Sequence, residues 1–524
     1  MALSENAFRA LQDIVGGQNI SRDPVVLESY NYYFLGEAQG YSDGTRFTPL
    51  RPGAVILPKS TEEVQAVVKV CNQFKLKTKA QSTNFGVLNT HFFEDEIIID
   101  LRRLNRIIEI DEKNRYAVVE PYVSWAQLQA ETMKVGLTPA IPGVGCHCSV
   151  LANLVTYGTG PYSWYAGFGD KYALSVEWVL PDGELLRLGS LGSCGRWFCG
   201  DGPGPSLRGL LRGEYGALGA MGVITKAATK LWDLPGLNSM PIQGAYPDFQ
   251  LDELPSTMEV YLLTWKSREK RGEAVLKLGE EGIGYHLYSW GVGYLATAVP
   301  ELEFLLPWKS GKPLPDEHFV AMTLVCHSHR EKRYQDRALK TILESTEGAV
   351  SPLILVPGVK QTIFRFLVRP DLVFLTTFRF ASGWFDTLYD FLGVMDTVNL
   401  VQNESLEIAK KLEGKAVLPG VWDTSCEPIF EYAHTIYTEC GGYYDAADPQ
   451  SVKDWLSTVK AINGPLTAKK IMRPSIGSSR ANIRAGQMMS NYHIWQGKLK
   501  AAFDPNYVCD AHYYIEPLVE ETQG

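Results

Sequence analysis

The sequence lacks any apolar run long enough to cross a membrane, which takes about 18 residues. It also lacks the charged-then-apolar leader of a secretory signal, so we expect a cytoplasmic protein. No internal repeat or low-complexity tract is present. The chain also has no excess of positive charge: its net charge is -9. This charge argues against nucleic acid or an anionic membrane as a partner.

Cysteine is sparse, with nine residues in 524 at irregular spacing. An odd, scattered set excludes a disulfide scaffold and favours reduced thiols. Two compact groups combine cysteine with histidine, at residues 146–148 and 326–329. Neither contains a CxxC pair or a second half-site, which structural zinc sites need. We therefore predict no metal.

The most informative stretch covers residues 55–87, where the pattern predicts a strand, a capped helix, a second strand and a tight loop. Ser60 and Glu63 have the spacing of a capping box, and apolar residues then recur along one helical face of 64–71. The loop at 82–86 offers backbone N–H groups, two hydroxyls and a glycine that is free to turn. Such a loop suits the binding of a phosphate group.

Three later segments, at 97–129, 176–189 and 221–232, follow in a fixed order. Together they resemble the FAD-binding domain of the vanillyl alcohol oxidase and p-cresol methylhydroxylase (PCMH) superfamily, over residues 47–234. The resemblance implies an α+β fold, in which a two-part PCMH-type FAD-binding domain holds an inserted α+β cap that binds substrate. It also implies an FAD-dependent oxidoreductase.

Domain limits follow from where this resemblance stops. A proline- and glycine-rich linker begins after Trp232. We therefore expect an FAD-binding domain at 1–235, with its PCMH-type core at about 47–234, a cap at 236–487 and a C-terminal segment at 488–524 that returns to the first domain.

Within the cap, alternating patterns predict sheet and helix in turn. We expect strands at 319–329 and 373–382, and helices at 331–345 and 384–398.

The resemblance assigns flavin contacts to the two loops and to the last segment of the first domain. The residues are Ser82, Thr83, Asn84, Phe85, Gly86 and Val87 in the first loop, Pro142, Gly143, Ser149, Asn153, Gly158 and Gly160 in the second, and Gly222 and Ile224 near the adenine end. Covalent attachment of the flavin is an option in this family, and the sequence leaves it open.

Three residues depart from the family pattern. Tyr122 replaces the glycine of a VEPG turn, and Leu151 stands where the second loop has a glycine that lets the backbone approach the pyrophosphate. Val87 replaces a tyrosine that helps to hold a phenolate in the aryl-alcohol branch. We therefore expect an altered second loop, and phenolate binding by that route is in doubt.

Candidate catalytic residues come from the last part of the cap and its continuation: His434, Tyr432, Arg473 and Arg480. We expect Tyr432, His434 and Tyr437 to lie on one helix, with His434 acting as a base. An arginine can neutralise a phenolate or clamp a carboxylate with two hydrogen bonds. Phenols and carboxylic acids both remain possible substrates.

These observations predict oxidation of an aryl alcohol, an alkylphenol or a related hydroxylated substrate by hydride transfer to flavin N5. Segments 23–34 and 207–219 are also similar to the D-lactate and glycolate dehydrogenase branch, which gives the alternative of a 2-hydroxy-acid dehydrogenase. A non-catalytic subunit is the second alternative, because of Tyr122 and Leu151. An electron-acceptor protein, such as a cytochrome or an electron-transfer flavoprotein, and a homo-oligomer are possible partners.

Overall fold

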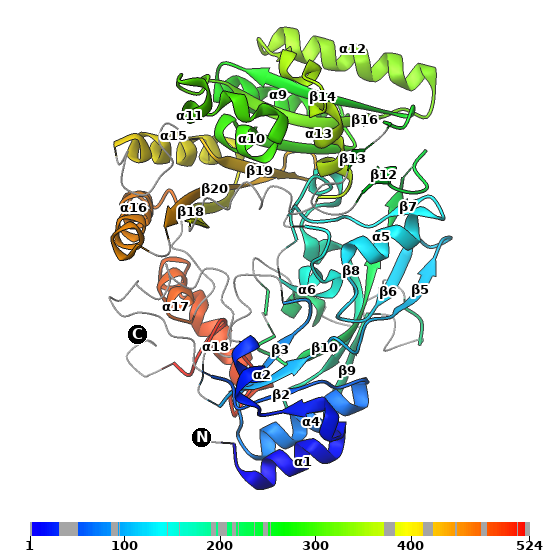
Figure 1. Cartoon of the computed structure of the whole chain (residues 1–524), viewed down its shortest axis with the longest axis vertical. Helices are drawn as coiled ribbons and strands as arrows, with labels where there is room; N and C mark the ends of the chain where they lie inside the picture. The colour runs from blue at the N-terminus through cyan, green and yellow to red at the C-terminus, as the bar shows by residue number, and fades with distance from the viewer. Residues whose placement is uncertain are drawn as a thin grey trace.

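The computed structural model describes most of the chain (Figure 1). The described residues are 3–30, 51–84, 93, 95–143, 145–156, 158–189, 195–197, 207–211, 216–217, 219–234, 236–244, 250–251, 253–370, 383–411, 423–445, 448–472, 479–510 and 512–518. Of residues 383–388 and 442–445 only the backbone is described.

The N-terminal part is built on two sheets, drawn in blue to green in the lower half of Figure 1. The first has the order β1-β2-β4-β3 and the second the order β5-β6-β10-β8-β9. The strands are β1 Ile20–Ser21, β2 Ala54–Ile56, β3 Thr78–Gln81, β4 Ile97–Asp100, β5 Ile107–Asp111, β6 Tyr116–Val119, β8 Ala173–Val179, β9 Leu185–Leu188 and β10 Val223–Lys230. A small pair, β7 Leu137–Thr138 with β11 Trp232–Asp233, lies beside them.

Short helices cover these sheets. They are α1 Glu5–Val15, α2 Pro24–Ser29, α4 Thr61–Gln73, α5 Trp125–Met133, α6 Val150–Val155 and α7 Ser163–Ala166. Helix α4 begins where the sequence predicts, because the Ser60 hydroxyl accepts a hydrogen bond from the Glu63 N–H at 3.3 Å. It connects β2 to β3, and both strands pair in parallel with β4. The loop predicted to bind phosphate therefore leaves the carboxyl end of a parallel strand.

The cap is built on one sheet of seven strands, in the order β17-β14-β16-β15-β19-β20-β18. The strands are β14 Met258–Trp265, β15 His286–Gly291, β16 His318–Val325, β17 Ala349–Val350, β18 Gly383–Gly393, β19 Ser425–Phe430 and β20 Thr435–Asp445. A small pair, β12 Ile242–Gln243 with β13 Gln250–Leu251, precedes it.

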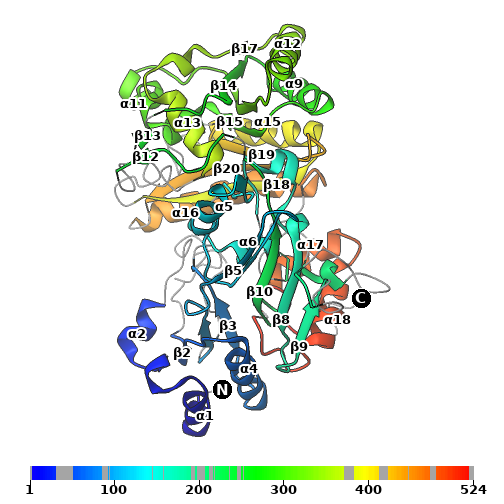
Figure 2. The ribbon, with the colours of Figure 1, turned by 90° about the vertical axis from the view of Figure 1, so that its right-hand side faces the viewer.

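Helices pack on both faces of the cap sheet (Figure 2). One face carries α9 Arg268–Glu280, α12 His329–Ser345, α15 Met395–Lys411 and α16 Pro449–Ala468. The other carries α13 Val359–Val368 against β14, β15 and β16, and near it are α10 Val292–Ala298 and α11 Pro307–Ser310. Short 3-10 turns lie at Gly17–Asn19, Gly169–Tyr172, Leu207–Leu211, Pro300–Leu305 and Pro352–Leu355.

Two helices predicted in the cap are wrong. Residues 384–398 form most of β18 and the start of α15, because Tyr389 and Phe391 face the helix-side core in alternation with Asp390. Tyr432, His434 and Tyr437 do not share a helix either. They belong to a hairpin, in which a turn at 431–434 joins β19 to β20. The strand predicted at 373–382 lies outside the described residues.

The chain then returns to the N-terminal part through α17 Ser479–Met488 and α18 Tyr492–Phe503, drawn in red (Figure 1). The Thr78 N–H at the start of β3 donates to the Val508 carbonyl at 2.7 Å, and the Asp510 N–H donates to the Thr78 carbonyl at 3.1 Å. Lys79 forms a buried ion pair with Asp510 at 2.5 Å. The C-terminal segment is thus fixed to the strand that carries the first loop.

A second buried ion pair holds α18 in place. Lys500 Nζ lies 2.6 Å from Asp504 Oδ2, and neither side chain is exposed to solvent. The same ammonium group donates to the Ala220 and Cys509 carbonyls. Because both charged groups are buried away from water, removing either one would leave the other without a counter-charge, which destabilises the folded state.

We therefore expect Lys500→Met to lower the free energy of unfolding by about 3 to 5 kcal/mol, because it leaves the Asp504 carboxylate buried without its cation. Urea unfolding followed by far-UV circular dichroism measures this loss. Lys340→Met is the matched control, because the Lys340 side chain is 76% exposed beside Glu344. Equal stability of the two variants would show that the Lys500 pair is not needed for stability.

Among the described residues, no helix is both long enough and apolar enough to cross a membrane.

Candidate active site

The first loop follows β3 directly. The Thr83 hydroxyl accepts a hydrogen bond from the Ser149 N–H at 3.0 Å, which ties the first loop to the second. Asn84 has a φ of 54°, in the left-handed region that asparagine tolerates better than most residues. Its Oδ1 is buried without a hydrogen-bond partner in the described part of the chain. Ser82 precedes them, whereas Phe85, Gly86 and Val87 lie outside the described residues.

The second loop folds back on itself through its glycines. The Gly143 N–H donates to the Thr159 carbonyl at 2.6 Å, and Gly145 N–H donates to the Pro142 carbonyl at 3.2 Å. A Cβ on Gly160 would lie 2.6 Å from the Gly143 nitrogen, which is closer than real Cβ contacts. Only glycine therefore fits at position 160.

Gly158 and Asn153 extend this packing. A Cβ on Gly158 would lie 3.1 Å from the Asn153 carbonyl oxygen. The Asn153 side chain accepts a hydrogen bond from Trp125 Nε1 at 2.8 Å. The predicted residues of the second loop are thus brought together by the fold.

The departure at Leu151 has a structural explanation. Residues 150–155 form helix α6, and the Ser149 hydroxyl caps it by accepting from the Ala152 N–H at 3.1 Å. The Leu151 side chain is 5% exposed and packs in the core of the N-terminal part. It therefore points into the core instead of occupying the loop.

At the predicted adenine end, Gly222 directly precedes β10 and has a φ of 117°. A Cβ there would lie 2.1 Å from the Val179 carbonyl oxygen and 3.1 Å from Trp178 Nε1. Ile224 follows on β10 and pairs with Trp178 on β8. Within the described residues, Trp178 Nε1 is buried without a hydrogen-bond partner.

Helix α7 joins the second loop to the cap. The Trp164 indole N–H donates to the Gly284 carbonyl at 3.1 Å, and its ring packs in the helix-side core of the cap. The Tyr432 N–H donates to the Trp164 carbonyl at 2.7 Å, and Glu431 forms an ion pair with Lys171. The turn of the β19–β20 hairpin is therefore anchored on the N-terminal part.

One face of the cap sheet lies toward the second loop. A Cβ on Gly143 would lie 3.3 Å from the Tyr288 hydroxyl oxygen of β15. Cys426 on β19 pairs with Glu439 on β20, and Glu439 pairs with Asp390 on β18. Paired residues of antiparallel strands share a face, so the two carboxylates lie directly opposite each other. We call Tyr288, Cys426, Glu439, Asp390 and Tyr437 the acidic face.

Tyr437 completes the acidic face, because its hydroxyl donates to Glu439 Oε2 at 3.3 Å. Burial raises the pKa of the Tyr288 hydroxyl well above its usual value, and Cys426 and Glu439 add to the effect. Burial and the nearby Glu439 likewise raise the pKa of the Cys426 thiol well above its usual value. Both groups are therefore neutral near pH 7, and the carboxylates supply the acceptors of this face.

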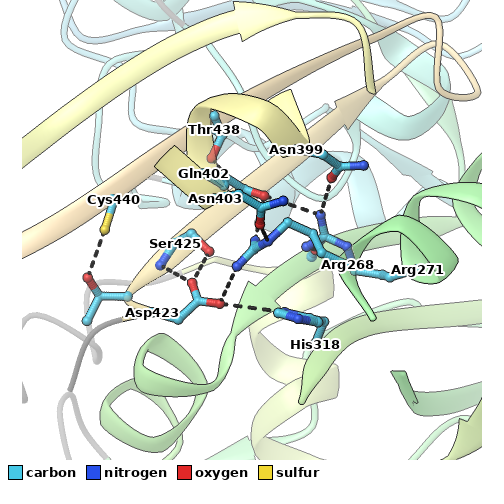
Figure 3. Close-up of polar contacts among 12 residues, drawn as sticks. Arg268, Arg271, His318, Asn399, Gln402, Asn403, Asp423, Ser425, Thr438 and Cys440 are labelled. Atoms are coloured by element: carbon cyan, nitrogen blue, oxygen red, sulfur yellow. Dashed lines mark hydrogen bonds and ion pairs between the residues drawn. The ribbon is translucent and has the colours of Figure 1, made fainter. Parts of the chain in front are cut away.

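A buried polar network supports the hairpin from the opposite face of the sheet (Figure 3). Arg268 lies 2.9 Å from Asp423, and Arg271 lies 2.8 Å from Glu427 on β19. Burial alone would raise the pKa of Asp423, but Arg268 and His318 hold it well below its usual range. The network binds β19 to helices α9 and α15, and so fixes the strand that carries Cys426.

The predicted catalytic residues are more dispersed than expected. His434 is exposed on the hairpin turn, and its N–H donates weakly to the Glu431 carbonyl at 3.4 Å. Tyr432 is 42% exposed, with its ring edge-on to Trp164 at 5.3 Å. Arg480 is exposed in the first turn of α17, and Arg473 lies outside the described residues. Their catalytic roles stay predictions.

Sequence reasoning missed Tyr288, Cys426, Asp390 and Glu439. Alternation in the segments 425–430 and 435–441 is the signal that could have revealed two strands. The pairing of Glu439 with Asp390 depends on the register between strands that lie far apart in sequence, which alternation does not give.

The described residues fit a flavin. Hydroxyl groups and tightly packed glycines line the two loops, and two buried polar atoms, Asn84 Oδ1 and Trp178 Nε1, lack partners among the described residues. No three His, Cys, Asp or Glu side chains in the described ranges are placed to hold a metal ion. The absence of a metal requirement stays a prediction.

Comparisons with known proteins agree with these loops. The family model described as FAD binding domain matches residues 52–189. The flavoprotein subunit of 4-cresol dehydrogenase (hydroxylating) from Pseudomonas putida is 31% identical over 188 residues, which are 33% of this chain and 34% of that protein. D-lactate dehydrogenase from Anaerostipes hadrus is 29% identical over 187 residues, 35% of this chain and 37% of the relative. These alignments thus span about a third of each protein.

The fold is shared over a much greater length. The crystal structure of p-cresol methylhydroxylase with substrate bound matches 98% of this chain and 96% of its own, with a TM-score of 0.75 and 15% identity. The predicted α+β class, with a PCMH-type FAD-binding domain and an inserted cap, is confirmed. Residues 52–189 thus form an FAD binding domain of the kind found in FAD-linked oxidoreductases, and the chain as a whole has the fold of p-cresol methylhydroxylase.

Proposed function

We propose that this protein is an FAD-dependent oxidoreductase that oxidises an aryl alcohol, an alkylphenol or a related hydroxylated substrate. When bound, FAD supplies a hydride acceptor at N5. Thr83, Asn84, Gly143, Ser149 and Gly160 would hold the cofactor, because they form the two linked loops. The acidic face of the cap, which Tyr288 connects to Gly143, would bind the substrate.

The pair of carboxylates on this face is the observation that carries the proposal. Asp390 and Glu439 lie opposite each other beside Tyr437. They share the acidic face with Tyr288, which lies next to Gly143 of the second loop. A carboxylate can accept a hydrogen bond from a substrate hydroxyl and then its proton. The hydroxyl of an alcohol or phenol therefore fits this face.

A D-lactate or glycolate type of 2-hydroxy-acid dehydrogenase is the alternative, supported by the D-lactate dehydrogenase relative. It needs a cation to hold the substrate carboxylate, and Arg473 and Arg480 are the predicted sources. A non-catalytic subunit has less support. The Leu151 side chain packs in the core and does not block the second loop from binding a flavin.

Re-oxidation by an electron-acceptor protein and assembly into a homo-oligomer remain proposals. The domain limits 1–235, 236–487 and 488–524 are proposed as well. The described elements agree with a break near residue 235, between β11 and β12.

We expect FAD, and not FMN, to be released when the purified protein is denatured. The reason is that the flavin segments include the adenine end at Gly222 and Ile224 as well as the phosphate loops. Chromatography of the supernatant against both standards distinguishes the two cofactors, and the pellet shows whether any flavin is covalently attached. Release of FMN alone, or an entirely colourless protein, would refute the cofactor assignment.

A substrate panel tests the reaction. We expect anaerobic bleaching of the flavin by aryl alcohols or alkylphenols and not by D-lactate or glycolate. Because Val87 cannot donate a hydrogen bond to a phenolate, p-cresol should react slowly, and Val87→Tyr should accelerate it, since a hydrogen bond to a charged group contributes about 1.5 to 3 kcal/mol. Rapid bleaching by D-lactate, lost in Arg473→Ala or Arg480→Ala, would favour the alternative instead.

A further inference from the structure

Helix α18 presents three of its large apolar side chains, Tyr492, Trp495 and Leu499, to solvent, while Phe503 at its end packs on Trp178. Its buried residues are His493, Gly497 and Lys500, whereas Tyr492 and Trp495 are 56% and 60% exposed. A surface helix ordinarily turns its apolar stripe toward the core and its charges outward. The first two turns of α18 therefore expose large apolar side chains while Lys500 is buried.

Two contacts fix this orientation. Lys500 is held in the interior by Asp504 and by the Ala220 and Cys509 carbonyls. On the same buried side, α17 approaches α18 closely, because a Cβ on Gly486 would lie 2.5 Å from the nitrogen of His493. Within the described residues, the exposure of Tyr492 and Trp495 is therefore a property of the packed helix.

Five exposed apolar residues follow one another along the end of α17 and the start of α18. Met488 and Met489 at the end of α17 lead through a short turn to Tyr492, and Trp495 and Leu499 follow on successive turns of α18. We call these five residues the α17–α18 patch. It lies in the lower half of the molecule, far from α12 at the top (Figure 1).

Basic residues accompany the patch. Lys498 Nζ lies 4.4 Å from the centre of the Trp495 ring, and exposed Arg484 lies one turn before Met488. Residues 455–503 contain no Asp or Glu, in a chain whose net charge is -9. Of its basic residues, Lys498 and Arg484 are exposed beside the patch, whereas Lys500 is buried against Asp504 and Lys469 pairs with Glu404.

We propose that the α17–α18 patch docks the protein on an anionic lipid surface. Tryptophan and tyrosine prefer the level of the lipid headgroups, and adjacent Lys and Arg side chains attract anionic lipids. An anionic bilayer supplies the negative charge that complements Lys498 and Arg484. A second copy docking by the same patch would bring no acidic side chain from residues 455–503 to pair with Lys498 and Arg484.

This inference revises an expectation from composition. The net charge of -9 argues against an anionic membrane only if the charge is spread evenly, and residues 455–503 show that it is not. The docking requires no membrane-spanning helix, because the patch would lie at the bilayer surface.

Flotation of the FAD-loaded protein with lipid vesicles tests the proposal. We expect binding to vesicles of equimolar phosphatidylglycerol and phosphatidylcholine at low salt, and none to phosphatidylcholine alone. Trp495→Ser combined with Leu499→Ser should weaken partitioning about tenfold or more, through lost apolar contact. Lys498→Ser should weaken it about fivefold, through lost attraction to the lipid charge.

Two variants outside the patch serve as controls. Trp308→Ser removes another exposed tryptophan on α11, and Lys340→Ser removes an exposed lysine on α12, so both should float like the unmodified protein. Absence of flotation with the anionic vesicles would overturn the proposal, and so would equal flotation of the Trp495/Leu499 variant. A dimer in solution that Trp495→Ser dissociates, or an acidic protein that binds the patch while the vesicles do not, would assign it to another partner.

Discussion

Replacement of Glu439 by Gln is expected to slow anaerobic flavin reduction by about 10²- to 10⁴-fold, the usual contribution of a positioned acid or base. Glutamine keeps the shape of the side chain and can still hydrogen-bond to Tyr437, but it cannot accept the proton of the substrate hydroxyl. The flavin content should not change, because Glu439 lies on the cap strand β20, away from the flavin loops. Stopped-flow absorbance with a substrate that bleaches the flavin measures the rate.

The pH profile separates Glu439 from His434, the base predicted from sequence. If Glu439 is the base, the reduction rate rises with pH as the carboxylate loses its proton, and Glu439→Gln lacks this rise. His434→Ala should retain it, because His434 is exposed on the hairpin turn and not on the acidic face. The reverse result, with the rise lost only in His434→Ala, would return the role of base to the histidine.

Gly160→Ala is expected to weaken flavin binding by about 10- to 100-fold, because forcing extra atoms into a packed site typically costs about 1 to 3 kcal/mol. The new Cβ would lie 2.6 Å from the Gly143 nitrogen and 2.8 Å from the Ile141 carbonyl oxygen. Both are backbone atoms, so the second loop must move to relieve the overlap. Flavin fluorescence during titration of the apoprotein with FAD measures the affinity.

Gly209→Ala is the matched control for this change. A Cβ at Gly209 would meet nothing within 4 Å, so this variant should bind FAD as the unmodified protein does. Thermal unfolding of both apoproteins shows whether the overlap at Gly160 damages the whole fold. Unchanged FAD affinity in a folded Gly160→Ala protein would show that the second loop does not hold the flavin.

Much of the N-terminal part could be predicted because its signals are local. Ser60 and Glu63 mark the start of α4 within four residues, and the loop after β3 is recognisable from its own composition. The family resemblance rests on contiguous segments of this part. The link between Thr83 and Ser149 joins residues that are 66 positions apart, and it could be inferred only from the order of segments in the family.

The cap was harder to predict because its acidic face is made by strand pairing. Asp390 and Glu439 meet through the pairing of β18 with β20, and neither residue has a distinctive neighbour in sequence. The hairpin turn at 431–434 also lacks glycine and contains three residues with positive φ, Glu431, Tyr432 and Ala433. Because glycine and proline are the residues that mark turns in sequence, a turn without them is hard to recognise, and the sequence pattern favours a helix there.

Comparison of flavin reduction by protiated and deuterated substrate is the most direct test of the central claim. The substrate is the aryl alcohol or alkylphenol that bleaches the flavin fastest, with deuterium on the carbon to be oxidised. We predict that deuteration slows anaerobic reduction severalfold, because the transfer of that hydrogen to the flavin limits the rate. Failure of every aryl alcohol and alkylphenol to bleach the FAD-loaded protein would contradict the account, and so would bleaching that proceeds without breaking this bond.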